Sequence, residues 1–202
     1  MLSIDDHARF WRQRAAEEGE LCYVALGDSL AQGYGASAPE RGYVGELAAL
    51  IGQRTGRTVR VVNLGVCGAT VRDLVTGQLP VLRQLQPHVV TVCIGANDAG
   101  NTAVEAFRSD FAAVCDAVPT GSFVADVPDF QGGHGSTDAR ELAALCRSVV
   151  DSTPGLVPVA VEAATTGMES TEFGTGFAHP DDRGYQRYIR AFWAALEPTL
   201  CG

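Results

Sequence analysis

Five short, nearly continuous apolar runs recur along the chain from residue 21 onward. They are rich in Val, and most are followed directly by Gly or Pro. The runs span residues 21–26, 58–64, 88–94, 121–127 and 156–162. Runs of this length without polar alternation are typical of strands that are covered on both faces, as in a parallel sheet.

The segments between these runs have the spacing of amphipathic helices. Residues 43–56 place their apolar side chains on one face, and Gly56 is expected to end that helix. Pro80 predicts a kink or a break in the helix over residues 71–85. Further helices are expected over residues 103–118, 138–152 and 180–196.

Strands that alternate with helices of this length imply right-handed crossovers. We therefore predict an α/β fold, a single-domain three-layer α/β/α arrangement around a flavodoxin-like, doubly wound five-stranded parallel sheet. The expected strand order is 2-1-3-4-5, with any site at the carboxyl ends of the strands. Within the 202 residues, a helical N-terminal extension is expected over 1–20, followed by one domain over 21–202.

Composition and charge narrow the range of partners. The formal net charge is −9, and the 15 basic residues form no cluster. Nucleic acid and anionic membrane surfaces are therefore not expected as partners. No apolar run approaches the ~18 residues of a membrane span, so none is predicted.

The six cysteines form no CxxC pair, and most lie in apolar runs. They are expected to be free thiols and not disulfides or zinc ligands. The acidic N-terminal segment lacks the apolar core of a secretory signal. The cytoplasm is the expected location. No phosphate-binding or dinucleotide motif is present, and no cofactor or metal is expected.

Candidate chemistry lies where the predicted strands end. Ser29 follows the first run, Gly68 the second and Asn97 the third, while His134 and His179 follow the fourth and fifth. The carboxyl ends of parallel strands meet at one edge of the sheet. A hydroxyl nucleophile, an imidazole base and nitrogen donors together favour acyl transfer.

Four segments carry a family resemblance that covers residues 23–196. They read GDSL at 27–30, NLGVCGAT at 63–70, IGANDAG at 94–100 and HPDDRGY at 179–185. In this order they resemble the SGNH/GDSL hydrolases, which are esterases and lipases with a flavodoxin-like fold. The resemblance implies that Ser29 is the nucleophile and His179 the general base. It also implies an oxyanion hole built from the N–H groups of Ser29 and Gly68 and the side-chain amide of Asn97.

Each of these residues also has a purely structural interpretation. Ser29 could cap a helix. His179 could cap the helix that Pro180 would begin. Gly68 could be a turn glycine, which is compatible with the oxyanion role. Asn97 could form an Asx turn.

The remaining candidates are weaker. His134, in GGHGS, is a rival base without the matching context. His88 is expected at the opposite edge of the sheet, and His7 precedes the sheet. Asp28 is expected to hold the turn beside Ser29 and not to react.

One departure from the family pattern concerns the imidazole. The family usually carries Asp three residues before the catalytic His, but Gly176 stands there. Asp181 and Asp182 favour a first helical turn instead, while Glu169 and Glu172 are freer to reach back. We hypothesise a Ser29–His179 dyad whose ring is held by a main-chain oxygen within residues 175–177, with Gly176 at the position of the missing acid. Such a base should titrate at or below ~6.5.

The sequence thus predicts a serine esterase that acts on a small-molecule ester through a Ser-acyl intermediate. Short segments follow the third and fourth runs, so short acyl chains are expected. A catalytically silent binding protein with the same fold and an acyltransferase are the alternatives. The sequence carries no signal for the oligomeric state.

Overall fold

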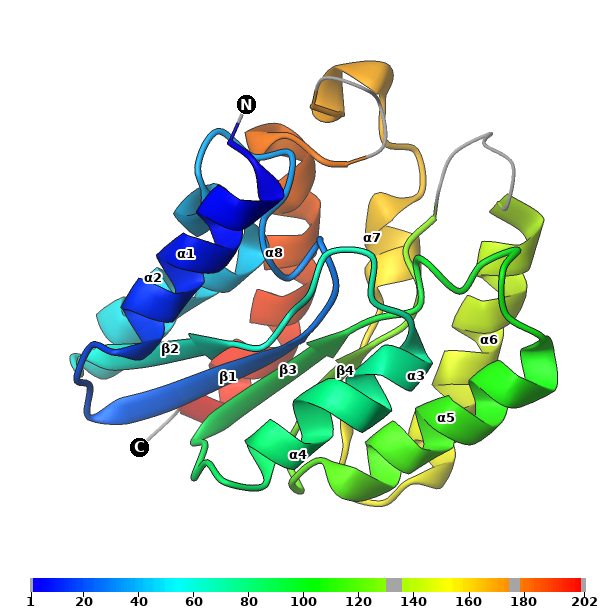
Figure 1. The fold of residues 1–202 in the computed structure, drawn as a ribbon, viewed down its shortest axis with the longest axis horizontal. Coiled ribbons are helices and arrows are strands. Elements are labelled where there is room, and N and C mark those ends of the chain that lie inside the picture. Colours follow the sequence, from blue (N-terminus) through cyan, green and yellow to red (C-terminus); the bar gives the residue numbers. More distant parts are fainter. Residues whose placement is uncertain (1, 130–135, 175–178, 201–202) are drawn as a thin grey trace.

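The computed structural model describes residues 2–129, 136–174 and 179–200, and it contains five parallel strands in one sheet. The strand order is β2-β1-β3-β4-β5, which confirms the flavodoxin-like topology (Figure 1). The strands are β1 Leu21–Gly27, β2 Val59–Asn63, β3 Val89–Cys93, β4 Phe123–Ala125 and β5 Val157–Val159.

Helices cover both faces of the sheet, as the prediction of three layers requires (Figure 1). One face carries α1 Ile4–Ala15, α2 Tyr43–Thr55, α7 Val161–Thr165 and α8 Asp182–Leu196. The other carries α3 Val71–Asp73, α4 Leu79–Leu82, α5 Val104–Ala117 and α6 Ser136–Ser152.

The strand β1 shows why these runs lack polar alternation. Tyr23 and Ala25 pack in the core on the side of α2 and α8, while Val24 and Leu26 pack in the core on the side of α5 and α6. All four side chains are fully buried. Because both faces are covered, both sets of alternating side chains must be apolar.

The strands β4 and β5 are shorter than the apolar runs that predicted them. Each spans three residues. The last strand lies at the edge of the sheet and contains Pro158, which has no N–H to donate. The short helix α7 follows β5 directly and was not predicted.

The break predicted at Pro80 is confirmed. Between α3 and α4 the chain forms a π-helical segment, Leu74–Gln78, and Pro80 lies in the first turn of α4. A proline in a first turn costs no intrahelical hydrogen bond.

The N-terminal helix α1 begins at a reciprocal cap between Ser3 and Asp6. It lies against β2, and its Trp11 is buried in the same core as α2 and α8. The boundary between an extension over 1–20 and a domain over 21–202 stays a prediction. None of the helices within the described residues is long and apolar enough to cross a membrane.

Candidate active site

The nucleophile candidate, Ser29, lies in a turn immediately after β1. The carboxylate of Asp28 accepts the N–H of Leu30 at 2.9 Å and so fixes this turn. No helix begins at Ser29, so its interpretation as an N-cap is wrong. Ser29 is buried, with 8% of its surface exposed.

His179 reaches this serine from the other end of the chain. Its Nε2 lies 2.9 Å from the Oγ of Ser29. The His179 carbonyl accepts the N–H of Gly174 at 2.9 Å, and Pro180 forms an antiparallel bridge with Phe173. Main-chain contacts therefore fix the backbone that carries the imidazole.

The structure corrects the expected start of the last helix. The N-cap is Asp181, whose carboxylate accepts the N–H groups of Arg183 at 2.8 Å and Gly184 at 3.0 Å. Two free donors of the first turn are thereby satisfied. His179 and Pro180 precede α8, so the interpretation of His179 as an N-cap is wrong.

The imidazole of His179 is half-buried, and burial lowers its pKa because the charged form loses water. Among the residues that the structure describes, no carboxylate forms a hydrogen bond or ion pair with His179. Gly176 and the rest of the 175–177 stretch lie outside the described residues. The main-chain oxygen proposed there stays a prediction, and so does any role for His134, which is also outside them.

The two glutamates that could reach back are engaged elsewhere. Glu172 accepts hydrogen bonds from Arg187 at 2.7 and 2.8 Å, which hold the pKa of this carboxyl below its usual value. Glu169 and Glu172 cap each other's backbone at a short 3₁₀ turn. Neither is therefore the acid partner of His179.

The aspartates after His179 are also occupied. Asp181 caps α8, and Asp182 accepts the backbone N–H and the hydroxyl of Ser37, both at 2.7 Å. Asp182 thus ties the start of α8 to the loop that follows Ser29.

The oxyanion-hole candidates, Gly68 and Asn97, lie beyond the carboxyl ends of β2 and β3. Gly68 has a φ of +81°, and no atom lies within 4 Å of where its Cβ would be. A side chain at this position would be strained and would project into open space. Gly68 therefore has the left-handed backbone conformation of a turn glycine, and no other atom covers the side of its main chain where a side chain would lie.

The Asn97 side chain makes long-range contacts. Its Nδ2 donates to the carbonyl of Ala69 at 2.9 Å and to the Oδ2 of Asp28 at 3.3 Å. Among the described residues, no nearby backbone N–H donates to the Asn97 side-chain oxygen, so the Asx-turn interpretation is wrong. The bond to Asp28 is the longer and therefore the weaker of the two. An oxyanion that accepted this N–H in place of Asp28 would cost the less hydrogen-bond energy.

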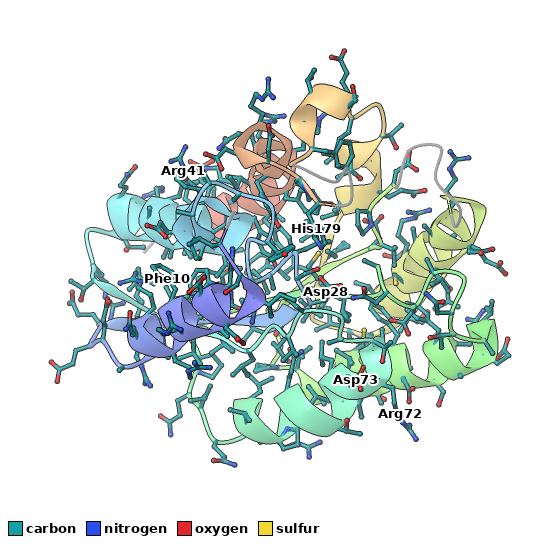
Figure 2. The ribbon with its side chains drawn as sticks, turned by 45° about the horizontal axis from the view of Figure 1, so that its top comes forward. Phe10, Asp28, Arg41, Arg72, Asp73 and His179 are labelled. Atoms are coloured by element: carbon teal, nitrogen blue, oxygen red, sulfur yellow. The ribbon has the colours of Figure 1, made fainter. Side chains whose placement is uncertain are left out.

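Asp28 is fully buried, and Figure 2 shows it near the middle of the molecule, below His179 in that view. Burial, with a smaller contribution from the charge of Asp98, raises the pKa of the Asp28 carboxyl to about 7. Its two oxygens hold the Ser29 turn and the Asn97 amide. The structure thus agrees with Asp28 as a residue that shapes the site.

Two glutamines missed by the sequence reasoning also shape the site. Gln78 accepts the N–H of Gly27 at 3.0 Å and donates to its carbonyl at 2.7 Å, as a neighbouring strand would. Gln32 donates to the carbonyl of Gly65 at 2.7 Å and accepts the thiol of Cys67 at 3.3 Å. No local pattern in the sequence marks either residue.

His88 and His7 lie in different places relative to the candidate site. His88 accepts the N–H of Cys22 at the start of β1, which places it at the opposite end of the sheet, as expected. His7 is buried, and its Nδ1 lies 2.9 Å from the carbonyl of Gln32. The sequence reasoning set His7 aside because it precedes the sheet, but the structure places it against the loop that carries Ser29.

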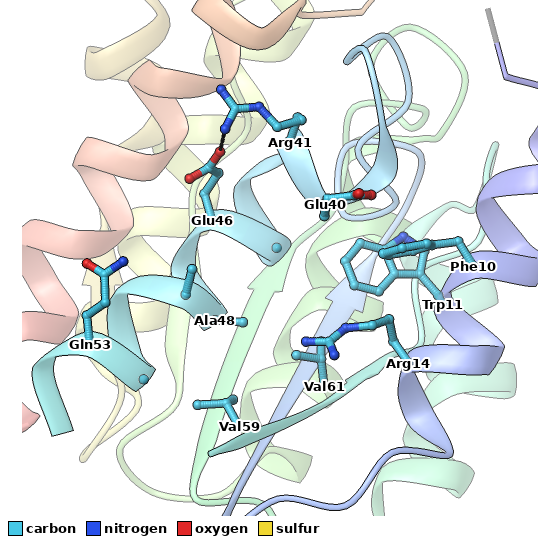
Figure 3. A pocket seen from close by; sticks show the side chains of 13 residues that line it. Phe10, Trp11, Arg14, Glu40, Arg41, Glu46, Ala48, Gln53, Val59 and Val61 are labelled. Carbon is cyan, nitrogen blue, oxygen red and sulfur yellow. Dashed lines mark hydrogen bonds and ion pairs between the residues drawn. The ribbon is translucent and has the colours of Figure 1, made fainter. Parts of the chain in front are cut away.

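Two surface hollows differ in their relation to this site. One of about 480 Å³ includes Gly68 and the exposed Val66 and Val81 among its lining residues. The other, of about 600 Å³, lies between α1, α2 and β2, where Arg41 and Glu46 form an ion pair (Figure 3). Only the first adjoins a residue of the candidate site.

Comparisons with known proteins agree with the geometry. A sequence profile described as the GDSL-like lipase/acylhydrolase family matches residues 25–187. No curated protein matches this chain.

Several solved structures share the fold at low sequence identity. An α/β hydrolase from a metagenome of Lake Arreo, Spain, has a TM-score of 0.75 at 22% identity, over 90% of this chain and 97% of its own. An acetylxylan esterase from Geobacillus stearothermophilus has a TM-score of 0.73 at 19% identity, over 88% and 94%. An esterase from a Pseudoalteromonas species has a TM-score of 0.69 at 16% identity, over 91% and 100%.

Proposed function

Because the chain belongs to the GDSL-like lipase/acylhydrolase family and is a carboxylic ester hydrolase, we propose that it is a serine esterase with a Ser29–His179 dyad. The observation that carries this proposal is the 2.9 Å contact between Ser29 Oγ and His179 Nε2. A nucleophile and a base within hydrogen-bond distance are the minimum that acyl transfer needs.

The chemistry follows from the two atoms in contact. His179 Nε2 accepts the Ser29 proton as Oγ attacks the ester carbonyl, so the neutral imidazole must carry its proton on Nδ1. The oxyanion is held by the N–H groups of Ser29 and Gly68 and by the Asn97 amide. The imidazolium then protonates the leaving alcohol. A water molecule, deprotonated by the same imidazole, then attacks the acyl carbon. The bond from this carbon to Ser29 Oγ breaks, the acid leaves, and the imidazolium returns its proton to Oγ.

The missing acid changes the energetics of this cycle. A carboxylate would stabilise the imidazolium, whereas a main-chain oxygen fixes the tautomer but carries only a dipole. Burial without a nearby anion keeps His179 neutral and ready to act as a base. We propose that the 175–177 segment, at or beside Gly176, supplies the oxygen for Nδ1.

The substrate is proposed to be a small ester with a short acyl chain. One structural neighbour is an acetylxylan esterase, and another is described as a lipase. The hollow beside Gly68 would accommodate a modest acyl or alcohol group. The cytoplasmic location and the absence of a nucleic-acid partner stay predictions.

The direct test is hydrolysis of p-nitrophenyl acetate, butyrate and octanoate. Ser29→Ala should abolish turnover, and His179→Ala should lower kcat by roughly 10²- to 10⁴-fold, the usual contribution of a general base. Ser152→Ala and His88→Ala are the matched controls, because Ser152 binds only Ser148 within its own helix and His88 lies at the opposite end of the sheet. Both controls should retain wild-type rates.

Several outcomes would contradict the proposal. Undiminished turnover by Ser29→Ala would exclude this serine as the nucleophile. An inert wild type would favour a silent binding protein. Formation of a new ester from an added alcohol, in preference to acid, would indicate an acyltransferase. Faster turnover of octanoate than of acetate would contradict the short acyl chain.

A further inference from the structure

The helix α1 contacts Gln32 in the loop that follows Ser29. This helix lies outside the family match, which begins at residue 25. His7 Nδ1 and Trp11 Nε1 lie 2.9 and 3.0 Å from the same acceptor, the carbonyl oxygen of Gln32. Both side chains are buried. Two donors on one carbonyl fix the position of the loop that follows Ser29, and both come from a helix that the family pattern does not include (Figure 1).

Tyr34 lies at the end of this loop and is anchored on both sides. Its N–H donates to the carbonyl of Ser29 at 3.0 Å. Its carbonyl accepts the hydroxyl of Tyr185, from α8, at 2.8 Å. The Tyr34 backbone is therefore fixed relative to the nucleophile and to the helix that follows His179.

The Tyr34 ring contacts two imidazoles, those of His179 and His7. Its centroid is 4.9 Å from that of His179, at an interplanar angle of 78°, which is an edge-to-face contact. The centroid of the Tyr34 ring also lies 5.4 Å from that of the His7 ring, at an interplanar angle of 54°. Edge-to-face pairs are worth ~0.5–1.5 kcal/mol beyond the area they bury, and they favour one ring orientation.

We propose that Tyr34 is a positioning residue for His179, with His7 of α1 holding the Tyr34 ring in place, in a chain that has Gly176 where the family has its acid. The proposal rests on the proposed dyad. A carboxylate orients an imidazole by charge and hydrogen bonding, whereas the Tyr34 ring orients it by shape. The ring also covers the imidazole, which is consistent with the burial that lowers the pKa of His179.

The first experiment compares Tyr34→Phe with Tyr34→Leu and Tyr34→Ala. Tyr34→Phe keeps the ring and should retain kcat within about threefold. Loss of the ring should lower kcat by about 10-fold, the factor that corresponds to ~1.4 kcal/mol, with little change in KM. Tyr34→Leu also removes the ring but keeps an apolar side chain, so it provides the test if Tyr34→Ala fails to fold. Unchanged kcat in Tyr34→Leu and Tyr34→Ala would overturn the proposal.

The second experiment does not depend on activity. The His179 ring proton is titrated by NMR in a Ser29→Ala background, with and without the Tyr34 changes. The pKa of His179 should rise toward its ordinary value of 6.5 in Tyr34→Ala and stay unchanged in Tyr34→Phe. An unchanged pKa in Tyr34→Ala would overturn the proposal. Failure of the proposed function itself would instead appear as turnover that survives Ser29→Ala.

The role of α1 is tested by His7→Ala, with His88→Ala as the matched control. His7→Ala should lower kcat in the same direction as Tyr34→Ala but by a smaller factor, because the ring loses one neighbour and keeps the other. It should also move the pKa of His179 upward. His88→Ala should change neither quantity. A His7→Ala enzyme with wild-type kcat and pKa would overturn the part assigned to α1.

Discussion

Gly35 and His179 approach so closely that a Cβ on residue 35 would lie 2.7 Å from the Cβ of His179. It would also lie 2.5 Å from the carbonyl oxygen of Pro180. Gly35 has a φ of +99°, and Gly174 packs so tightly against it that a Cβ on residue 174 would lie 2.9 Å from the Gly35 carbonyl oxygen. Three main-chain segments thus fix the place of the imidazole.

Gly35→Ala should therefore lower kcat by about 10²-fold, because displacement of a catalytic group by ~1 Å can cost that much. The control is Gly121→Ala, which has a φ of +86° but nothing within 4 Å of its Cβ. Both variants should lose ~1–2 kcal/mol of unfolding free energy from the left-handed backbone. Gly35→Ala should lose more than Gly121→Ala, because its Cβ would also clash with Pro180 and His179. Equal kcat values in the two variants would show that the close approach does not position His179.

Asn97→Ala should lower kcat by ~10²- to 10³-fold with little change in KM, since an oxyanion donor acts mainly in the transition state. Asn101→Ala is the matched control. The Asn101 side chain is exposed and binds only nearby carbonyls. Steady-state kinetics on p-nitrophenyl acetate separate the two parameters. A change confined to KM would contradict a donor role for Asn97.

The pH dependence of kcat/KM follows from the lowered pKa of His179. The base must be neutral, so the rate should fall only below about 6.5, as the imidazole gains a proton. The unfolding free energy should also fall as the pH falls. His179 has its ordinary pKa of about 6.5 in the unfolded state and a lower pKa in the folded state, so below pH 6.5 the unfolded state binds the proton more readily and is favoured. An acidic limb centred well above 7 would indicate an anionic partner for His179.

Gln78→Leu should lower the unfolding free energy by roughly 2–3 kcal/mol, because it leaves the buried N–H and carbonyl of Gly27 unpaired. Gln84→Leu is the control, since Gln84 is exposed in the turn after α4 and its amide donates a 3.3 Å bond to the carbonyl of Pro80. Urea unfolding at one pH measures both. Equal losses of unfolding free energy in the two variants would mean that the two hydrogen bonds between Gln78 and Gly27 do not stabilise the fold.

The sequence predicted the sheet because each strand is a local apolar run and the topology of such runs is strongly restricted. The convergence of the carboxyl ends of parallel strands also predicted that Ser29 and His179 lie close together. Ser29 and His179 are 150 residues apart and in contact. Gly68 and Asn97 follow β2 and β3, which lie on either side of β1 in the sheet.

The contacts that the sequence did not predict are long-range and leave no local signature. The hydrogen bond from His7 to the Gln32 carbonyl joins residues 25 positions apart in the sequence, and the bonds between Gln78 and Gly27 join residues 51 positions apart. The helix α8 begins two residues later than Pro180 suggests, because the Asp181 carboxylate satisfies two N–H donors of the first turn.

We propose that His179, alone among the described side chains, makes Ser29 nucleophilic. Fluorophosphonate labelling followed by peptide mass spectrometry tests it most directly. The wild type should carry one adduct, on the Ser29 hydroxyl, and His179→Ala should be labelled roughly 10²- to 10⁴-fold more slowly. An adduct on another residue, or equal labelling rates in the two proteins, would contradict the account.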